Sequence, residues 1–306
     1  MTGDDLRRRV GGWPLVRAIT DLPPVGRTIA VSTHARLVRP ALGYAARELS
    51  GDRRAHRYVL RCGDRVVFLR HNTTDASILE EIFAARIYQP PQPVQAALRG
   101  LGRPLRIADL GANVGLFGLF AFERWQCERL TAFEPHPENA ALQRRTIAAN
   151  RLQDRWRLIE ACAFTADGKL PFARDHHSDS RMTADTLASE NGDPAHDTPA
   201  PDDPAHSPDG RELVAAVDAL PLLADADLLK IDIEGGEWAL LADPRFAELP
   251  ATAIAVEYHP HLAPGHDARA HARRELERNG FTALEVFHDP RGHGMLWAWR
   301  ATGPTR

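Results

Sequence analysis

The stretch "LRIADLGANVGLFGLF", residues 105–120, decides the fold. Its apolar run ends at Asp109, and Gly111, Gly115 and Gly118 then stand among small and large apolar residues. A buried strand that ends in a glycine turn and leads into a helix is typical of α/β domains that bind a cofactor. The alternative is that these glycines only cap a helix and allow tight packing. The first question is therefore which cofactor such a turn fits.

The chain as a whole has the composition of an ordinary globular protein. It has 306 residues, of which 43% are hydrophobic and 26% charged, and its net charge is −3. This length favours one large α/β domain with an appended region. The charge gives no reason to expect nucleic acid or a membrane as a partner. Three scattered cysteines (Cys62, Cys127 and Cys162) and an N-terminus unlike a signal peptide predict a cytoplasmic protein.

From Leu105 onward, strand and helix patterns alternate. This alternation predicts a Rossmann-like, seven-stranded, mostly parallel sheet with helices on both faces. The last two strands follow each other closely, so one of them must run antiparallel to its neighbour. We expect strands at 105–110, 129–134, 156–163, 227–233, 252–258, 281–287 and 294–299, and helices at 114–125, 137–149, 237–242 and 267–279.

The residues before this core form a predicted N-terminal extension, 1–100, that caps the cofactor and substrate site. Its patterns indicate a helix closed by Gly51, a β-hairpin across Gly63 and Asp64, and a helix that begins at Thr74 or Asp75. Proline and glycine mark the connection at 90–104, and the catalytic domain is expected to span 101–306.

One segment of the predicted core, residues 174–211, interrupts the alternation. It is rich in Asp, Pro, His, Ala and Ser, a composition that buries little apolar surface. We expect a long mobile insert. Its position between two core strands suggests a lid over the site, and the alternative is a surface insertion without a role.

The glycine turn excludes two common cofactor motifs. Asn113 stands where the dinucleotide fingerprint has its middle glycine, and no Lys-Ser/Thr pair follows to make a P-loop. The remaining pattern, D-x-G-x-x-x-G, suits S-adenosylmethionine (SAM), which has an amino-acid end and a ribose but no phosphate. Asp109 would meet its ammonium group, and Glu134, at the end of the next strand, would accept hydrogen bonds from the ribose hydroxyls. The ribose hydroxyls of NAD would donate the same hydrogen bonds to Glu134, so Glu134 does not distinguish SAM from NAD.

A second group of polar residues follows the strand within "LLKIDIEGGEWALL", residues 228–241. Lys230, Asp232 and Glu234 share one face if the strand continues to Ile233. Charged residues are costly in a central parallel strand unless they face a site. The next strand brings Glu257 and His259 to the same edge of the sheet, where α/β proteins bind ligands.

Four motifs in this order, "DLGANVG", "FEPHPEN", "LLKIDIEGGEW" and "VEYHP", resemble the FkbM family of SAM-dependent methyltransferases. The resemblance covers roughly residues 65 to 300, without the insert. It implies the class I methyltransferase fold and O-methylation of a hydroxyl on a small natural product or sugar, with possible assembly into a homo-oligomer left open. The alternatives are an N-methyltransferase on the same fold and a non-catalytic or NAD-binding Rossmann module.

The predicted catalytic residues are His259, Asp232, Glu234 and Glu257. His259 is the candidate general base, because an imidazole titrates near neutral pH. The alternatives are that His259 caps a backbone carbonyl group and that Asp232 only pairs with Lys230. No metal is predicted, although Asp232, Glu257 and His259 offer ligands that Mg²⁺ would accept.

The predicted cofactor-binding residues lie on four parts of the chain: the glycine turn, the end of the second core strand, the third core strand and the helix upstream of the core. They are Asp109, Gly111, Ala112, Asn113, Gly115, Glu134, Pro135, His136, Cys162, Ala163, Asp232, Thr74 and Asp75.

Overall fold

The structure, a computed structural model, describes residues 30–173, 181–182 and 212–300. The chain divides into two compact units, Met1–Ala85 and Arg86–Arg306. This division lies before the boundary expected at residue 100, because the segment after it belongs with the core. That the first unit caps the site stays a prediction. Within the described part of the chain, no helix combines the length and apolar character needed to cross a membrane.

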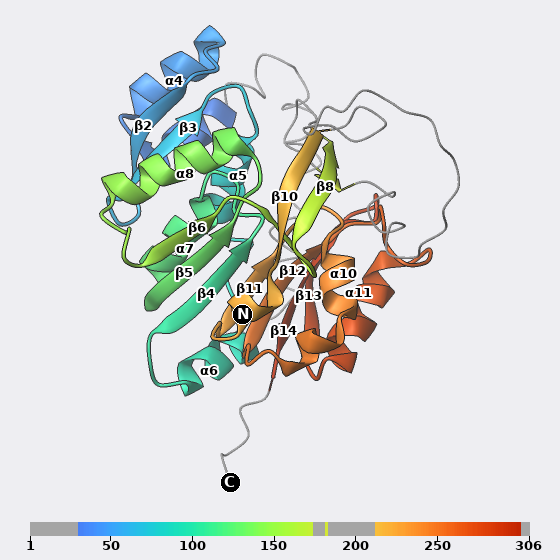
Figure 1. Cartoon of the computed structure of the whole chain (residues 1–306). Helices are drawn as coiled ribbons and strands as arrows, with labels where there is room; N and C mark the ends of the chain where they lie inside the picture. The colour runs from blue at the N-terminus through green and yellow to red at the C-terminus, as the bar shows by residue number, and fades with distance from the viewer. Residues whose placement is uncertain (1–29, 174–180, 183–211, 301–306) are drawn as a thin grey trace, which may run out of the picture. The chain divides into compact units, whose positions relative to one another are not determined.

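The first unit contains a small antiparallel sheet and short helices, as Figure 1 shows. The predicted hairpin is present: β2 and β3 pair antiparallel, with Val59 opposite Val66. The predicted helix after it begins as an α-helix, continues as a π-helix and ends at Ala85. The elements are β1 (Val38–Arg39), α4 (Ala41–Ser50), β2 (Ala55–Leu60), β3 (Val66–Arg70), α5 (Asp75–Leu79) and η1 (Glu80–Ala85).

The second unit contains a seven-stranded sheet in the order β13-β14-β12-β11-β4-β5-β6. The pairs from β12 through β6 are parallel, and β14 runs antiparallel to both of its neighbours, as predicted. The order of the strands reverses between β4 and β11, which is where open α/β sheets bind ligands. The strands are β4 (Leu105–Leu110), β5 (Cys127–Phe133), β6 (Trp156–Ile159), β11 (Leu228–Ile231), β12 (Ala253–Tyr258), β13 (Thr282–His288) and β14 (Gly294–Trp299).

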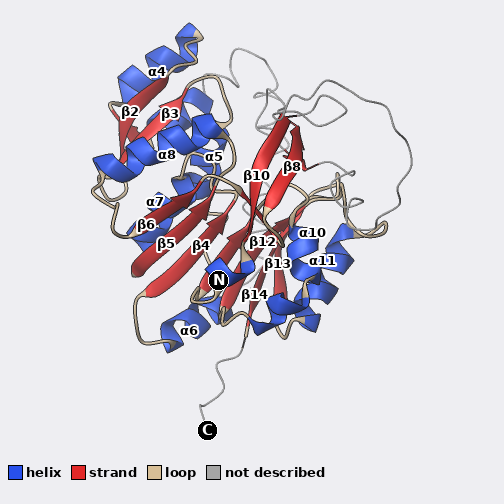
Figure 2. Ribbon diagram, viewed as in Figure 1, coloured by secondary structure: helices blue, strands red, loops and turns tan. Residues whose placement is uncertain are grey.

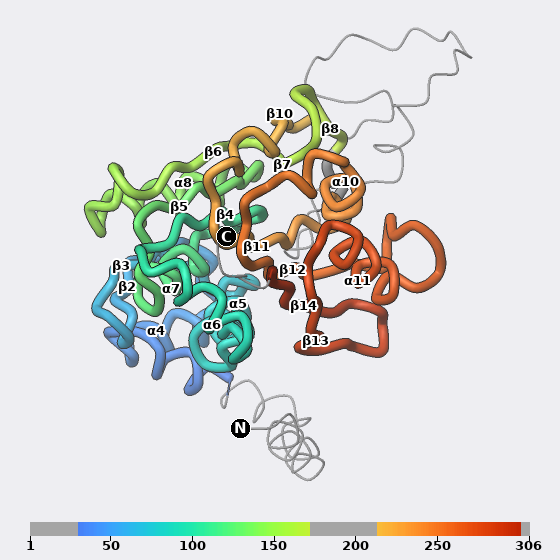
Figure 3. The backbone as a smooth tube through the Cα atoms, turned by 90° about the horizontal axis from the view of Figure 1, so that it is seen from below, coloured from blue at the N-terminus to red at the C-terminus, as the bar shows by residue number. Residues whose placement is uncertain are grey.

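Helices cover both faces of this sheet (Figures 2 and 3). Helices α10 and α11 lie on one face and α6 and α7 on the other, while α8 packs against β6. The prediction missed α6, which occupies most of the segment taken as a connection. The helices are α6 (Gln92–Gly100), α7 (Leu116–Arg124), α8 (Pro137–Ala149), α10 (Glu237–Ala242) and α11 (Ala268–Arg278), with 3-10 turns η2 (Leu220–Leu223) and η3 (Pro244–Glu248).

A second sheet of four strands, in the order β7-β10-β8-β9, was not predicted. The single strand expected at 156–163 is two strands, because the chain leaves the main sheet after Ile159 and β7 pairs with β10 instead. The predicted insert, 174–211, lies outside the described residues except for β9. The strands are β7 (Cys162–Phe164), β8 (Gly168–Ala173), β9 (Arg181–Met182) and β10 (Glu212–Asp218).

The packing of α7 against β6 depends on Gly118. A Cβ atom there would lie inside van der Waals contact of the Trp156 ring. Alanine is favoured over glycine in a helix by about 1 kcal/mol, but an overpacked contact costs about 1–3 kcal/mol. We therefore expect Gly118→Ala to lower the free energy of unfolding, as measured by urea denaturation.

The matched control is the same substitution in a Trp156→Leu background, in which the ring is absent. There Gly118→Ala should be neutral or stabilising. An equal cost in both backgrounds would contradict the contact as the cause.

Candidate active site at the carboxyl ends of β4, β11 and β12

The glycine turn after β4 brings two strands into close contact. Gly111, Asn113 and Gly115 all have positive φ angles, of 79°, 50° and 86°. A Cβ atom on Gly111 would overlap the carbonyl oxygen of Asp232, which follows β11. The residue at 111 must therefore be glycine for β4 and β11 to approach each other at this edge.

Lys230 lies buried between the ends of these two strands. Its Nζ is 3.3 Å from Oδ1 of Asp109 and 3.2 Å from Oδ2 of Asp232, and it donates a 2.7 Å hydrogen bond to the carbonyl oxygen of Gly111. Burial alone would lower the pKa of Lys230, but the two carboxylates raise it, so the ammonium stays charged. The ion pair considered as an alternative role for Asp232 is present. It leaves the Asp232 side chain 26% exposed at the edge.

Asp109 has no exposed surface, and burial raises the pKa of its carboxyl group despite the neighbouring Lys230. Neither of its oxygens has a hydrogen-bond partner among the described residues. Oδ1 is instead paired with the Lys230 ammonium at 3.3 Å, and because Asp109 is fully buried a ligand's donor would reach it only if neighbouring side chains move. Tyr88, which was not predicted, donates a long 3.4 Å hydrogen bond to Asp232 from the segment before α6.

Glu134, directly after β5, connects the glycine turn to the start of α8. Its carboxylate accepts hydrogen bonds from the backbone N–H groups of Asn113 (2.7 Å) and His136 (2.8 Å). Burial raises the pKa of Glu134 to about 7, against the effect of these donors. Oε1 also accepts a 3.3 Å hydrogen bond from the side-chain amide of Asn139, so the side chain shapes the turn and Oε2 keeps a lone pair for a further donor. Ala112 and Pro135, which adjoin the two donors, are also at this edge.

His259, directly after β12, is held by an acid that the sequence analysis missed. Oε1 of Glu237 accepts from the backbone N–H of His259 (2.9 Å) and lies 3.1 Å from its ring Nδ1. Oε2 of Glu237 accepts from the N–H of Gly235 (2.8 Å). Glu237 is fully buried and is the first residue of α10. An acid in the first turn of a helix is common for reasons of the helix dipole alone, so its sequence position did not reveal this role.

The other nitrogen of His259 faces the remaining acids of the site. Its Nε2 lies 3.3 Å from Oε2 of Glu234 and 4.0 Å from Oδ1 of Asp232. Asp232, Glu257 and His259 each place one ligand atom within 4.8 Å of the other two. The four predicted catalytic residues are therefore brought together. One expectation is wrong. The strand was expected to continue to Ile233, but β11 ends at Ile231, and Glu234 lies in a turn in which its φ is 51°.

The protonation of His259 differs from the expectation for a general base. Burial alone would lower its pKa, but the carboxylates of Glu237, Glu234 and Asp232 raise it to about 10. At neutral pH the ring therefore carries a proton on each nitrogen, and a base must have one of them free. The alternative that His259 caps a backbone carbonyl group also does not hold, since both nitrogens face carboxylates.

The remaining predicted cofactor residues lie in two places. Cys162 and Ala163 are buried in β7, and burial, with a smaller effect of Glu134, raises the pKa of the thiol to about 12, so it is no nucleophile. Thr74 and Asp75 belong to the first unit. There Thr74 precedes α5 without a side-chain capping bond, and the buried carboxylate of Asp75 pairs with Arg70 at 2.8 Å. That Thr74 and Asp75 touch a cofactor stays a prediction.

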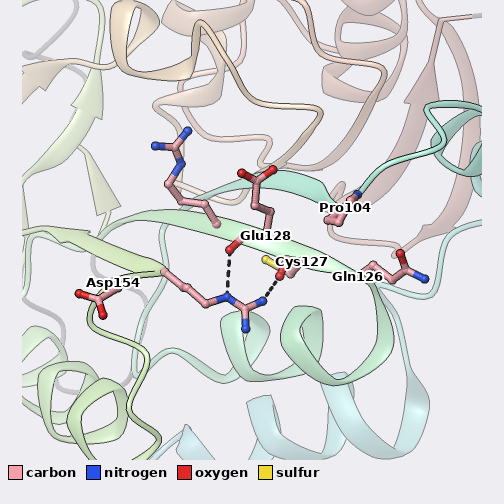
Figure 4. Close-up of a pocket in the computed structure, with 7 residues that line it drawn as sticks. Pro104, Gln126, Cys127, Glu128 and Asp154 are labelled. Atoms are coloured by element: carbon pink, nitrogen blue, oxygen red, sulfur yellow. Dashed lines mark hydrogen bonds between the residues drawn. The ribbon is translucent and has the colours of Figure 1, made fainter.

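The opposite edge of the sheet has a depression of about 630 Å³ (Figure 4). Its lining comes from the amino ends of β4, β5 and β6. There Arg155 donates to the carbonyl oxygens of Cys127 and Glu128. Parallel α/β sheets bind ligands at the carboxyl ends of their strands, so this depression is not the candidate site. Its lining residues are Pro104, Gln126, Cys127, Glu128, Arg129, Asp154 and Arg155.

The strand order, the single antiparallel strand β14 and the position of the site define a class I methyltransferase fold. The model of the FkbM methyltransferase domain matches residues 109–283, more than half of the chain. The chain belongs to the FkbM methyltransferase family. A comparison with curated proteins finds no match.

Similar solved structures include two methyltransferases and a protein solved in complex with AdoMet. Methyltransferase FkbM from Methylobacillus flagellatus KT is 14% identical with a TM-score of 0.41, and the match covers 94% of this chain but only 60% of that one. Precorrin-6y C5,15-methyltransferase from Geobacter metallireducens GS-15 is 14% identical with a TM-score of 0.36, over 68% of this chain and 87% of that one. M. jannaschii TYW2 in complex with AdoMet is 9% identical with a TM-score of 0.37, over 80% and 85%.

The close approach at Gly111 can be tested with a matched pair of glycines. Gly102 also has a positive φ (63°), but a Cβ there would meet no atom within 4 Å. Alanine at either position pays roughly 1–2 kcal/mol for the left-handed backbone. Only the Cβ of Gly111→Ala also overlaps a backbone atom. We therefore expect Gly111→Ala to lower the free energy of unfolding, measured by urea denaturation, by at least ~2 kcal/mol more than Gly102→Ala does.

An equal decrease in the free energy of unfolding for the two variants would contradict the close approach of β4 and β11. If Gly111→Ala fails to fold while Gly102→Ala folds, the close approach is supported.

Proposed function

We propose that this protein is a SAM-dependent O-methyltransferase that acts in the cytoplasm on a hydroxyl group of a small natural product or sugar. The observation that carries the proposal is the cluster of Asp109, Lys230 and Asp232 at the point where the strand order reverses, with Asp232 26% exposed at the edge. The FkbM family supports the reaction. The resemblance, rather than the geometry, supports a hydroxyl over an amine as the acceptor.

The residues at this edge fit the parts of SAM in turn. The ammonium group would pair with the acids around Lys230, which are the buried Asp109 and the partly exposed Asp232, and the glycine turn would offer backbone groups to the methionine part. Glu134 would accept from the ribose hydroxyls. The buried β7 residues Cys162 and Ala163 would form an apolar surface for the adenine. Asn113 carries a Cβ and an amide where a pyrophosphate would need to approach, which supports SAM over NAD.

When bound, SAM would supply an activated methyl group. The protein would orient the acceptor oxygen and accept its proton. Asp232, Glu234, Glu257 and His259 lie together and would form the acceptor side. We assign hydrogen bonds from the hydroxyl group to the carboxylates, because the ring of His259 is enclosed by acids. His259 then orients these carboxylates, a change from its expected role as the base.

Calorimetry with SAM, S-adenosylhomocysteine and NAD tests the choice of cofactor. We expect both sulfur compounds to bind with one site per chain and NAD to give no saturable heat. Binding of NAD alone would overturn the proposal and favour a dinucleotide-binding module. Binding of neither class would favour a non-catalytic role.

The pH dependence of SAM binding tests the role of Glu134. Its pKa of about 7 in the free protein means that half of the molecules carry a neutral carboxyl group at that pH. Ribose hydroxyl donors favour the carboxylate, so bound SAM must displace the proton. We therefore expect the affinity to fall as the pH falls through 7 and to be roughly tenfold weaker at pH 6 than at pH 8.

In Glu134→Gln, which cannot titrate, SAM binding should be weaker overall and lose this tenfold dependence. A wild-type affinity that is constant between pH 6 and 8, or a dependence that persists in Glu134→Gln, would contradict the role of Glu134.

A further inference from the structure

We propose that Asp232, Glu257 and His259 form a binding site for a divalent cation of the Mn²⁺ type on the acceptor side of the active site. The proposed methyl transfer does not require such an ion. One ligand atom from each residue lies within 4.8 Å of the other two, and the three come from the ends of two adjacent parallel strands. The function of the ion rests on the proposed function, but its binding does not.

The spacing of the three ligand atoms suits an ion at their centre. Ligands of Mg²⁺ lie ~2.1 Å from the metal, so adjacent ligands of one octahedral ion are ~3.0 Å apart and opposite ligands ~4.2 Å apart, and the three atoms would have to approach one another on binding. Carboxylates without an ion repel one another, and a slightly wider spacing is expected before binding. Asp232 and Glu257 are both partly exposed, so a rotation of their side chains would bring the ligand atoms closer together.

The orientation of His259 is that of a metal ligand. Histidines that bind metals usually donate their second ring nitrogen to a carboxylate, which fixes the ring. Here Nδ1 of the 2% exposed His259 lies 3.1 Å from Oε1 of Glu237, and the backbone N–H of His259 donates to the same oxygen. The ring is therefore held with Nε2 toward Asp232 and Glu234, and an ion there would replace the proton that this nitrogen carries in the free protein.

The charge at this edge also favours a cation. Five carboxylates lie there, against the ammonium of Lys230 and the ring of His259. Lys230 is shared between Asp109 and Asp232, and its Nζ also donates to a backbone oxygen. The five acids are Asp109, Asp232, Glu234, Glu237 and Glu257.

The ligand types narrow the choice of ion. Carboxylate oxygens suit Mg²⁺ and Mn²⁺, whereas imidazole suits transition metals, so a set with two carboxylates and one imidazole favours Mn²⁺ over Mg²⁺. Three protein ligands leave coordination positions open for a substrate. An ion here would bind the oxygen of the acceptor and favour its deprotonated form, which supplies a reason for so many acids around a single histidine.

Binding of Mn²⁺ can be measured by the loss of its free electron paramagnetic resonance signal, with no SAM or acceptor present. We expect one Mn²⁺ per chain in the wild type. Glu257→Gln and His259→Gln should each weaken binding at least tenfold. Glu237→Gln keeps all three ligands but removes the carboxylate behind the ring, and it should weaken binding about 10- to 100-fold.

The matched control is Glu128→Gln, at the opposite edge of the sheet, which should bind Mn²⁺ as the wild type does. Thermal denaturation with and without Mn²⁺ keeps the test informative if a variant is poorly folded, since Mn²⁺ should raise the Tm of the wild type but not that of Glu257→Gln. Failure of the wild type to bind Mn²⁺, or equal binding by wild type and Glu257→Gln, would overturn the site.

The metal site and the proposed function fail separately. Mn²⁺ binding without SAM binding would support the metal site and contradict the proposed methyl transfer. SAM binding and methyl transfer by protein that binds no Mn²⁺ would support the proposed function and contradict the metal site.

Discussion

The buried ammonium group of Lys230 is the contact on which the rest of the site depends. It lies between Asp109 on β4 and Asp232 after β11, and it donates to the backbone of the glycine turn. Removing one partner of a buried ion pair costs about 3–5 kcal/mol, because the other charge is left without compensation. Lys230 thus allows two acids to stand side by side at the point where the strand order reverses.

This arrangement separates the edge of the sheet into two sides. Asp109, the glycine turn and Glu134 lie on the side of β4 and β5. Glu234, Glu257 and His259 lie on the side of β11 and β12. Asp232 belongs to both, through its ion pair with Lys230 and its 4.0 Å distance from His259. A methyl donor and its acceptor need such an arrangement, because the two reacting atoms must meet in line between their binding sites.

The sequence predicted the main sheet well, because its strands and helices have clear periodic patterns. The strands at 105–110 and 294–299 and the helices at 137–149 and 237–242 have the predicted bounds. The second sheet was missed because it depends on pairing between β7 and β10, which are distant in the chain. No local sequence pattern predicts that pairing.

The sequence predicted the residues that line the candidate site, but not the residues that hold them in place by hydrogen bonds. Carboxylates at strand ends are visible in a sequence, so Asp232, Glu257 and His259 could be placed at one edge. Glu237 and Tyr88 act only through tertiary contacts, Glu237 from the first turn of a helix and Tyr88 from the segment before α6. The protonation of His259 likewise depends on which acids surround its ring, and only the tertiary structure shows which acids these are.

A crystal structure of the protein with S-adenosylhomocysteine would show whether the carboxyl edge between β4 and β11 binds the methyl donor. We expect the ribose hydroxyls at Glu134, the ammonium group within hydrogen-bond distance of Asp109 or Asp232, and the sulfur facing Asp232. A ligand at the opposite edge of the sheet, or an ammonium group away from both acids, would rule out binding at this edge.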